Sequence, residues 1–235
     1  MNCSTIVDLL QYRSLHENQK NQNIYTFLQD GETEAGSLSY QELEKKARAI
    51  GAYLQSLNAY GNRVLLLYSP GLEFITGFFG CLYAGAIAVP AYPPRPDQTL
   101  DRLDAIVSDA EAKFAFTTTS LVNYLQSRFA ENPKLMAVNL IATDNITNTN
   151  EADWHQPEIN TDTLAFLQYT SGSTGAPKGV MISHGNMMHN LAMGAAASEF
   201  HANSRTITWL PFSHNTGMLT GVVQPLYNNF PVIIM

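Results

Sequence analysis

The sequence predicts an α/β fold, with a largely parallel, doubly wound sheet and flanking helices. Segments with a strand pattern alternate with segments with a helix pattern from Ser39 to Met235, which is typical of this class. Short, continuous apolar runs such as Val64–Tyr68 indicate strands that are buried on both faces. A chain of 235 residues, 45% of them hydrophobic, is long enough to bury a sizeable core.

The first elements form a β-α-β unit that begins behind a well-marked helix. Ser39-Tyr40-Gln41-Glu42 is a capping box, and apolar residues then recur at helical spacing as far as Leu57. A strand over 63–68, a helix over 72–83 and a strand over 86–89 follow. This order favours parallel strands joined by a crossover helix.

The remaining elements alternate in the same way. The three prolines of Ala91–Pro96 exclude regular structure there. Helices are expected over 100–110, 121–129, 184–200 and 218–227, and strands over 113–117, 137–142, 205–210 and 231–235.

A polar stretch, Asp144–Asp162, separates two parts of the chain. Its only large apolar anchor is Trp154, so we interpret it as a surface connection. The predicted division is a first α/β subdomain over 1–160 and the start of a second one over 161–235, which is truncated. Alternatively, the stretch is an insertion that marks no boundary.

Composition excludes several classes of protein. The formal net charge of −7 and the absence of a basic stripe argue against nucleic acid as the main partner. Cys3 and Cys81 make no disulfide framework, and no signal peptide is visible in the first residues, so we expect the cytoplasm. Phe74–Pro90 is uncharged, but glycines interrupt it and it is shorter than the roughly 20 residues of a membrane span.

The run Thr170–Gly179, T-S-G-S-T-G-A-P-K-G, predicts a phosphate-binding loop. Glycines let backbone N–H groups converge, hydroxyls add donors and Lys178 adds a positive charge. The spacing fits neither G-x-x-x-x-G-K-[ST] nor G-x-G-x-x-G. Alternatively, the run is a polar surface turn between two strands, with Lys178 as a solvated loop residue.

A second informative stretch is Trp209–Met218, which carries His214 in a Pro/Gly loop after an apolar strand. Loops that follow strands are where α/β proteins place ligands, and an imidazole can orient a carboxylate or close a pocket. Alternatively, His214 caps a helix. No spacing of Cys, His, Asp or Glu suggests a metal site built by the protein.

Tyr169–Val180, Y-T-S-G-S-T-G-A-P-K-G-V, resembles the phosphate signature of the adenylate-forming superfamily, and Trp209–Met218 is similar to that family's aromatic-plus-histidine motif. The resemblance implies that the loop closes over the β- and γ-phosphates of ATP, with Mg²⁺ entering alongside ATP and held largely by phosphates and water. The implied ATP-binding residues are Thr170, Ser171, Gly172, Ser173, Thr174, Gly175 and Lys178. The implied acyl-substrate residues are His214, Asn215 and Gly217. Asn215 stands where the family commonly has a carboxylate, so a role that needs negative charge is in doubt.

The branch of the family is indicated by three further segments. V-P-A-Y-P-P over 89–94, Arg102–Ile106 and Gln224–Tyr227 are similar to fatty acyl-AMP ligases. That branch makes an acyl-adenylate from a fatty acid and passes the acyl group to the phosphopantetheine thiol of an acyl carrier protein, as in polyketide and lipopeptide biosynthesis. Alternatively, the chain resembles an acyl-CoA synthetase.

The family's members are more than twice as long, so the resemblance implies an incomplete N-terminal domain of an adenylate-forming enzyme. The apolar strand at Pro231–Met235 lacks a cap or polar ending, which also indicates a fragment. The family's adenine-binding motifs and catalytic lysine are expected beyond Met235. We therefore assign no catalytic residue within this chain and expect it to be inactive alone. Alternatively, it is a non-catalytic structural or interaction module.

Overall fold

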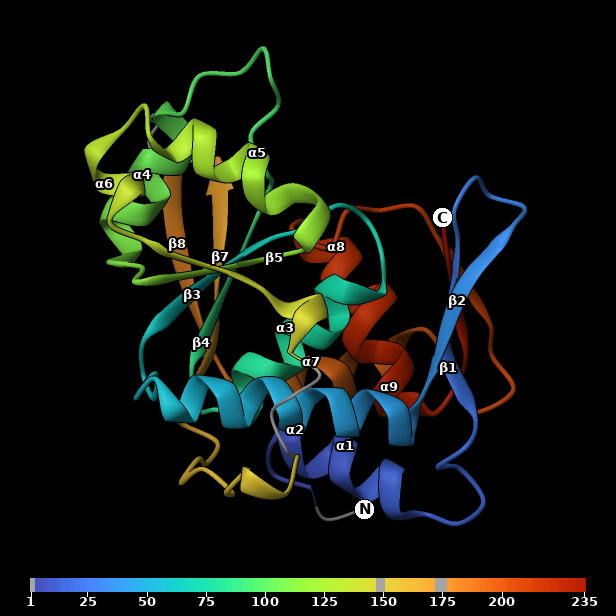
Figure 1. The fold of residues 1–235 in the computed structure, drawn as a ribbon. Helices are drawn as coiled ribbons and strands as arrows, with labels where there is room; N and C mark the ends of the chain where they lie inside the picture. The colour runs from blue at the N-terminus through green and yellow to red at the C-terminus, as the bar shows by residue number, and fades with distance from the viewer. Residues whose placement is uncertain (1–2, 147–150, 172–176) are drawn as a thin grey trace.

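The strands of the molecule form two sheets within the part of the chain that the structure describes. The computed structural model describes residues 3–146, 151–171 and 177–235. One sheet has six strands in the order β6-β5-β3-β4-β7-β8, and the other has four in the order β2-β1-β10-β9 (Figure 1). With helices flanking both, the predicted α/β class is confirmed.

The six-stranded sheet is parallel except at one edge. From β6 to β7 neighbouring strands run parallel, whereas β8 runs antiparallel to β7. Its strands are β3 (Arg63–Leu67), β4 (Ile87–Ala91), β5 (Phe114–Thr117), β6 (Asn139–Ala142), β7 (Leu164–Ser171) and β8 (Pro177–Ser183). Along the chain, β3 is followed by β4 on one side of it and β4 by β5 on the other side, so the connections leave in opposite directions from β5 and β3, and likewise from β4 and β7.

The four-stranded sheet joins the beginning of the chain to its end. β1 (Asn23–Leu28) pairs antiparallel with β2 (Glu34–Ser39) and parallel with β10 (Val232–Ile234). β10 in turn pairs parallel with the edge strand β9 (Thr206–Thr208). These pairings connect residues about as far apart as this chain allows.

The helices lie against both faces of the six-stranded sheet and between the two sheets. The longer helices are α1 (Ile6–Leu15), α2 (Tyr40–Ser56), α3 (Leu72–Tyr83), α4 (Asp101–Ala110), α5 (Thr119–Phe129) and α7 (His184–Ala197). The short helical segments are α6 (Pro133–Met136), η1 (Thr143–Asn145), η2 (Glu151–Asp153), α8 (Asn215–Met218), η3 (Leu219–Val223) and α9 (Gln224–Asn228). Because α3 contacts strands of both sheets, it lies between them (Figure 1).

Apolar side chains form two cores, one on each face of the six-stranded sheet. The larger core holds α1, α2, α3 and the four-stranded sheet, and includes Phe78, Phe79 and Phe166. The smaller core, with Leu65, Val89 and Leu103, packs α4 and α5 on the opposite face. Alternating side chains of the buried strands enter different cores, as their continuous apolar runs require.

Most elements lie where the sequence predicts them. The capping box at Ser39 and Glu42 is present, α3 has the expected bounds, and the β-α-β unit is parallel. The helix expected over 218–227 is in fact three consecutive segments, with a π-helical turn at Leu219–Val223 between α8 and α9. No element was predicted before Ser39, where α1, β1 and β2 lie.

The connection between β6 and β7 is anchored by Trp154, as expected. Its indole N–H donates to the Tyr83 carbonyl oxygen at 2.7 Å, and the Arg48 guanidinium lies 4.6 Å from the ring centroid.

The two sheets do not follow the predicted division of the chain. β1 and β2 share a sheet with β9 and β10, whereas β7 and β8 complete the sheet of β3–β6. The division into 1–160 and 161–235 stays a prediction.

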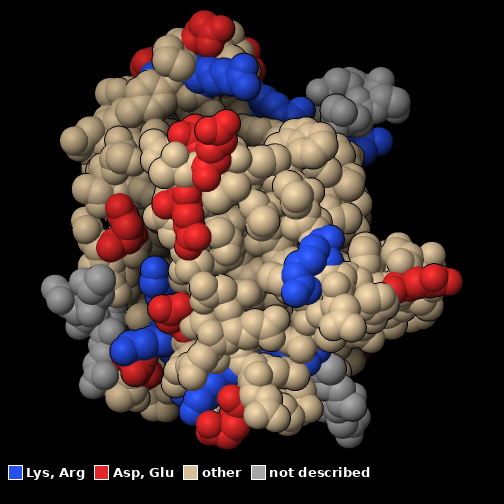
Figure 2. All heavy atoms as spheres, turned by 90° about the vertical axis from the view of Figure 1, so that its right-hand side faces the viewer, with Lys and Arg blue, Asp and Glu red and all other residues tan. Residues whose placement is uncertain are grey.

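Uncharged residues cover much of the face seen in Figure 2, where lysines and arginines stand singly or in small groups. Cys81 lies in the core, and burial raises the pKa of its thiol. Among the described helices, none combines the length and the apolar character that crossing a membrane requires.

Candidate functional site

The two stems of the predicted phosphate loop are the ends of an antiparallel hairpin. β7 and β8 pair up to Ser171 and Pro177, and Thr170 lies directly opposite Lys178. Gly172, Ser173, Thr174 and Gly175, four of the predicted ATP-binding residues, lie outside the described residues. Thr170 and Lys178 are both exposed, so a hydroxyl and an ammonium group stand side by side at this end of the hairpin.

Alternation along β7 divides the stem residues between two faces. Successive side chains of a strand point to opposite faces, so Gln168 and Thr170 share one face and Tyr169 occupies the other. Lys178 lies on the face of Gln168 and Thr170, because directly opposite residues share a face.

On the face toward α4, Tyr169 fixes the hairpin to the helix. Its phenol donates to Asp109 Oδ2 at 2.5 Å. Burial, together with the neighbouring Asp109 carboxylate, raises the pKa of the Tyr169 phenol, so it stays protonated as a donor. Gly179 lies opposite Tyr169, and a Cβ there would come within 2.9 Å of the tyrosine ring. The absence of a side chain at Gly179 therefore lets the Tyr169 ring lie across β8.

On the other face, Gln168 fixes the hairpin to the histidine loop, which we define as residues 209–217. Gln168 is 5% exposed, and its Nε2 donates to the Ser213 carbonyl oxygen at 2.8 Å. Ser213 directly precedes His214. The face that carries Thr170 and Lys178 is thus the face that contacts the histidine loop.

His214 is exposed and begins the short helix α8. Its Nδ1 accepts the Thr216 backbone N–H at 3.4 Å, so the histidine is the N-cap of α8. The helix-capping role is therefore present, and the exposed ring does not exclude contact with a ligand. Asn215 is exposed beside it.

Gly217 is buried where the backbone of the histidine loop folds onto itself. A Cβ at 217 would lie 2.3 Å from the Pro211 carbonyl oxygen, a contact that no side chain tolerates. Close backbone approach explains this glycine, and its predicted contact with a substrate stays a prediction.

A cavity of about 80 Å³ lies beside the histidine loop. Its walls come from the ends of β3 and β4, at Tyr68 and Tyr92, and from Trp209, Phe212 and Met235. Open α/β sheets bind ligands at the carboxyl ends of strands whose connections leave in opposite directions, and β3 and β4 each flank such a point. The lining is largely aromatic and aliphatic. The volume is below the roughly 300–1,000 Å³ of a typical ligand pocket, so the cavity can hold only part of a ligand.

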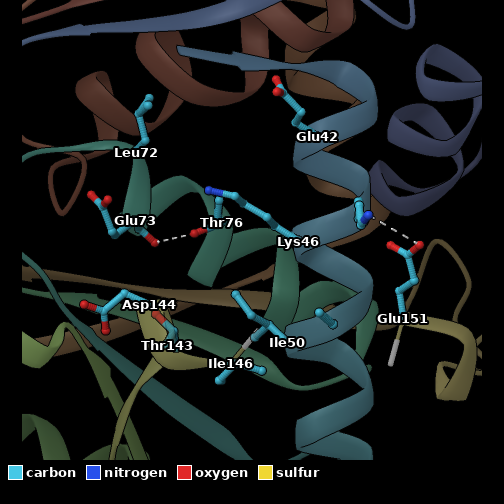
Figure 3. A pocket seen from close by; sticks show the side chains of 12 residues that line it. Glu42, Lys46, Ile50, Leu72, Glu73, Thr76, Thr143, Asp144, Ile146 and Glu151 are labelled. Atoms are coloured by element: carbon cyan, nitrogen blue, oxygen red, sulfur yellow. Dashed lines mark hydrogen bonds and ion pairs between the residues drawn. The ribbon is translucent and has the colours of Figure 1, made fainter. Parts of the chain in front are cut away.

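A larger pocket of about 550 Å³ lies elsewhere, between α2, α3 and the segment after β6 (Figure 3). Most of its charged groups are already engaged by the fold. Glu42 closes the cap of α2, Lys45 pairs with Glu151 at 3.9 Å, and Asp144 accepts the Thr119 N–H at 2.9 Å. It shares no lining residue with the cavity beside the histidine loop, so size alone does not make it the candidate site.

Among the other histidines, His184 has a structural role. It is 1% exposed at the start of α7, and its Nδ1 accepts the Ile6 backbone N–H at 3.4 Å. His16, His155 and His201 are exposed. Across residues 3–146, 151–171 and 177–235, no group of three or more His, Cys, Asp or Glu side chains is arranged to hold a metal ion.

Sequence reasoning missed Gln168 and Asp109 as parts of the site. Tyr169 belonged to the motif but had no assigned role. Strand alternation next to the phosphate loop predicts that Gln168 and Tyr169 point to opposite faces, but their partners are 45 and 60 residues away in sequence.

A model of the AMP-binding enzyme family matches residues 15–235. The chain is 45% identical to the medium-chain-fatty-acid–[acyl-carrier-protein] ligase JamA of Moorena producens, over 99% of this chain and 40% of JamA. It is 38% identical to the long-chain-fatty-acid–AMP ligase FadD32 of Mycobacterium marinum, over 77% of this chain and 29% of that protein.

Among solved structures, the fold is similar to a fatty acyl-adenylate ligase from L. pneumophila, in complex with acyl adenylate and pyrophosphate. The TM-score is 0.89 at 35% identity, covering 99% of this chain and 40% of that one. The chain therefore spans about 40% of the length of JamA and of this ligase.

Proposed function

Because the chain belongs to the AMP-binding enzyme family, we propose that the protein containing it activates a fatty acid with ATP and passes the acyl group to an acyl carrier protein. A carboxylate oxygen attacks the α-phosphorus of ATP, the bond from that phosphorus to the bridging oxygen of the β-phosphate breaks, and pyrophosphate leaves. The carrier thiol then attacks the acyl carbonyl carbon, loses its proton and displaces AMP. The observation that carries the proposal is the hairpin that presents Thr170 and Lys178 together beside the histidine loop.

The described stem residues fit a polyphosphate. Lys178 supplies a positive charge and Thr170 a hydroxyl donor on the same face of the hairpin, with both side chains exposed. Charge-assisted hydrogen bonds of this kind are the strong ones for phosphate oxygens. ATP supplies the leaving group and the electrophilic phosphorus, and Mg²⁺ would be held largely by phosphates and water. We also expect the protein in the cytoplasm, where ATP is available.

The acyl group fits the apolar side of the histidine loop. Phe212 packs its ring 5.3 Å from that of Phe74, and both line the cavity of about 80 Å³. An apolar wall favours an alkyl chain over water. His214 directly follows the lining residue Ser213 and is exposed, which supports a role for its ring in meeting the carboxylate of an acyl chain held on the apolar wall. His214 and Asn215 would then orient the carboxylate toward the hairpin.

Within this chain, catalysis would rest on positioning and on charge stabilisation. The Asp109 and Ser213 contacts hold both faces of β7 directly before the loop. A fixed stem keeps donors aimed at the phosphates, which lowers the barrier without chemical participation.

The test is acyl-adenylate formation by the complete protein. Mass spectrometry of a reaction with ATP and saturated fatty acids of increasing chain length should show acyl-AMP, and then acyl carrier protein in preference to coenzyme A as acceptor. Efficient acyl-CoA formation would assign the protein to the acyl-CoA synthetases. No adenylate with any acid, and no exchange of pyrophosphate into ATP, would make it a non-catalytic module.

A further inference from the structure

Gln168 joins the two halves of the proposed site through a single side chain. It comes from β7, two residues before Thr170, and its amide ends on Ser213, one residue before His214. Any displacement of β7 therefore acts directly on the backbone of the histidine loop.

The carbonyl end of the same amide has no partner in the part of the chain that the structure describes. Among the described residues, nothing is hydrogen-bonded to Gln168 Oε1, although the atom is buried. A buried acceptor without a donor lowers stability, so an apolar side chain of similar size would fill this position with less loss. Oε1 of this glutamine lowers stability, whereas Nε2 connects the hairpin to the histidine loop. This combination suggests a role beyond packing.

Two contacts restrain the elements on either side of the Gln168–Ser213 hydrogen bond. The opposite face of β7 is held on α4 by the Tyr169–Asp109 hydrogen bond. The histidine loop is restrained from its far side by the packing of Phe212 on Phe74. Between these two restraints, the Gln168–Ser213 hydrogen bond sets the distance from the hairpin to the wall of the small cavity.

We propose that Gln168 is a positioning residue that couples the phosphate-loop hairpin to the histidine loop, so that ATP and the fatty acid strengthen each other's binding. The inference rests on the proposed function, because it takes the hairpin as the ATP side and the histidine loop as the acyl side. A ligand that orders one loop reduces the cost of ordering the other, and the effect is reciprocal.

The test measures this coupling in the complete protein by isothermal titration calorimetry. The dissociation constant of a non-hydrolysable ATP analogue is measured without and with saturating decanoate. We expect decanoate to tighten wild-type binding about tenfold, within the usual range of coupling between sites. Gln168→Met keeps the side chain's length but removes the donor, and should reduce the factor to about one.

The chain offers a matched control. Gln224 is also 5% exposed, and its Nε2 also donates to a backbone carbonyl oxygen, that of Leu191, at 3.0 Å. It does not contact the histidine loop through that bond. Gln224→Met should therefore keep the wild-type coupling factor, even if it lowers the melting temperature.

A wild-type factor in Gln168→Met, or an equal loss in Gln224→Met, would overturn the proposal. A measurement on the wild-type protein alone covers the case in which the variants do not fold. The ATP analogue should slow amide hydrogen exchange in residues 209–217, and unchanged exchange would also overturn it. Acyl-adenylate formation by the wild-type protein is scored separately, so the coupling can fail while the proposed function stands.

Discussion

Two histidines at the starts of helices accept similar hydrogen bonds in this molecule, but their surroundings are opposite. At the junction of α1 and α7, His184 Nδ1 accepts a backbone N–H at 3.4 Å, and the ring is buried. In the histidine loop, His214 Nδ1 accepts a backbone N–H at the same distance, and the ring is exposed. The bond does not distinguish a structural histidine from one that can meet a ligand, whereas the surroundings do.

The largest expected effect separates the two histidines by pH. Burial lowers the pKa of His184 from an ordinary 6.5 to about 4, with a smaller opposing effect from Asp8. The unfolded chain therefore binds this proton more readily. The neutral His184 ring makes its full contribution to the free energy of unfolding above pH 6.5, and this contribution is lost as the pH falls through about 4. The total loss is on the order of 3 kcal/mol.

Urea unfolding of the 235-residue chain between pH 7.5 and 3.5 would measure this loss. His184→Leu should flatten the part of the curve between about pH 6.5 and 4. The same pH dependence in wild type and His184→Leu would show that His184 is not the group responsible.

The second prediction tests how tightly the histidine loop is built. Gly217→Ala places a methyl group against the Pro211 carbonyl oxygen, so the backbone must move, at a cost of about 2 kcal/mol. The melting temperature should fall accordingly. Gly36→Ala is the control, because its Cβ would meet only the Leu72 side chain at 3.5 Å. Equal melting temperatures for Gly217→Ala and wild type would mean that the loop is free to relax.

The third prediction concerns the hairpin that faces the histidine loop. In the complete protein, Lys178→Ala should raise the KM for ATP about tenfold, because one charged contact with a phosphate is lost. The KM for the fatty acid should stay unchanged. Lys113, exposed just before β5 and so at the amino end of the sheet, offers a control lysine. Unchanged ATP kinetics in Lys178→Ala would assign Lys178 to a solvated loop position.

The smallest stability effect is expected at His214. Removing its cap by His214→Ala should cost about 0.5–1 kcal/mol, and His214→Asn should restore the cap, because asparagine is a good N-cap residue. If the ring also meets the acyl substrate, both variants should raise the KM for the fatty acid several-fold. Normal fatty-acid kinetics in His214→Asn would reduce His214 to a cap.

Much of the fold was predictable because its helices and strands follow from local sequence patterns. The capping box at Ser39, the apolar run of β3 and the glycine-bounded helix α3 are each decided by neighbours within a few residues. The N-terminal elements were not predicted. Ile6–Leu15 carries apolar residues on several sides, so its helical pattern is weak. The hairpin of β1 and β2 joins the rest of its sheet through β10, about 200 residues later.

In the candidate site, too, the features that depend on adjacent residues were predictable, whereas the contacts between distant residues were not. The order T-S-G-S-T-G-A-P-K-G and the W-L-P-F-S-H stretch marked both loops, because loop chemistry depends on adjacent residues. Nothing local indicated that Asp109 would meet Tyr169, or that Ser213 would meet Gln168.

By itself, the sequence determined the alternation of strands and helices, the two loops and the resemblance to adenylate-forming enzymes, because capping, periodicity and motif order act between near neighbours. The tertiary structure decided which histidine is buried, which face of the hairpin meets the histidine loop, and how the ends of the chain share one sheet. Those outcomes depend on contacts between residues far apart in the sequence, which local patterns do not specify.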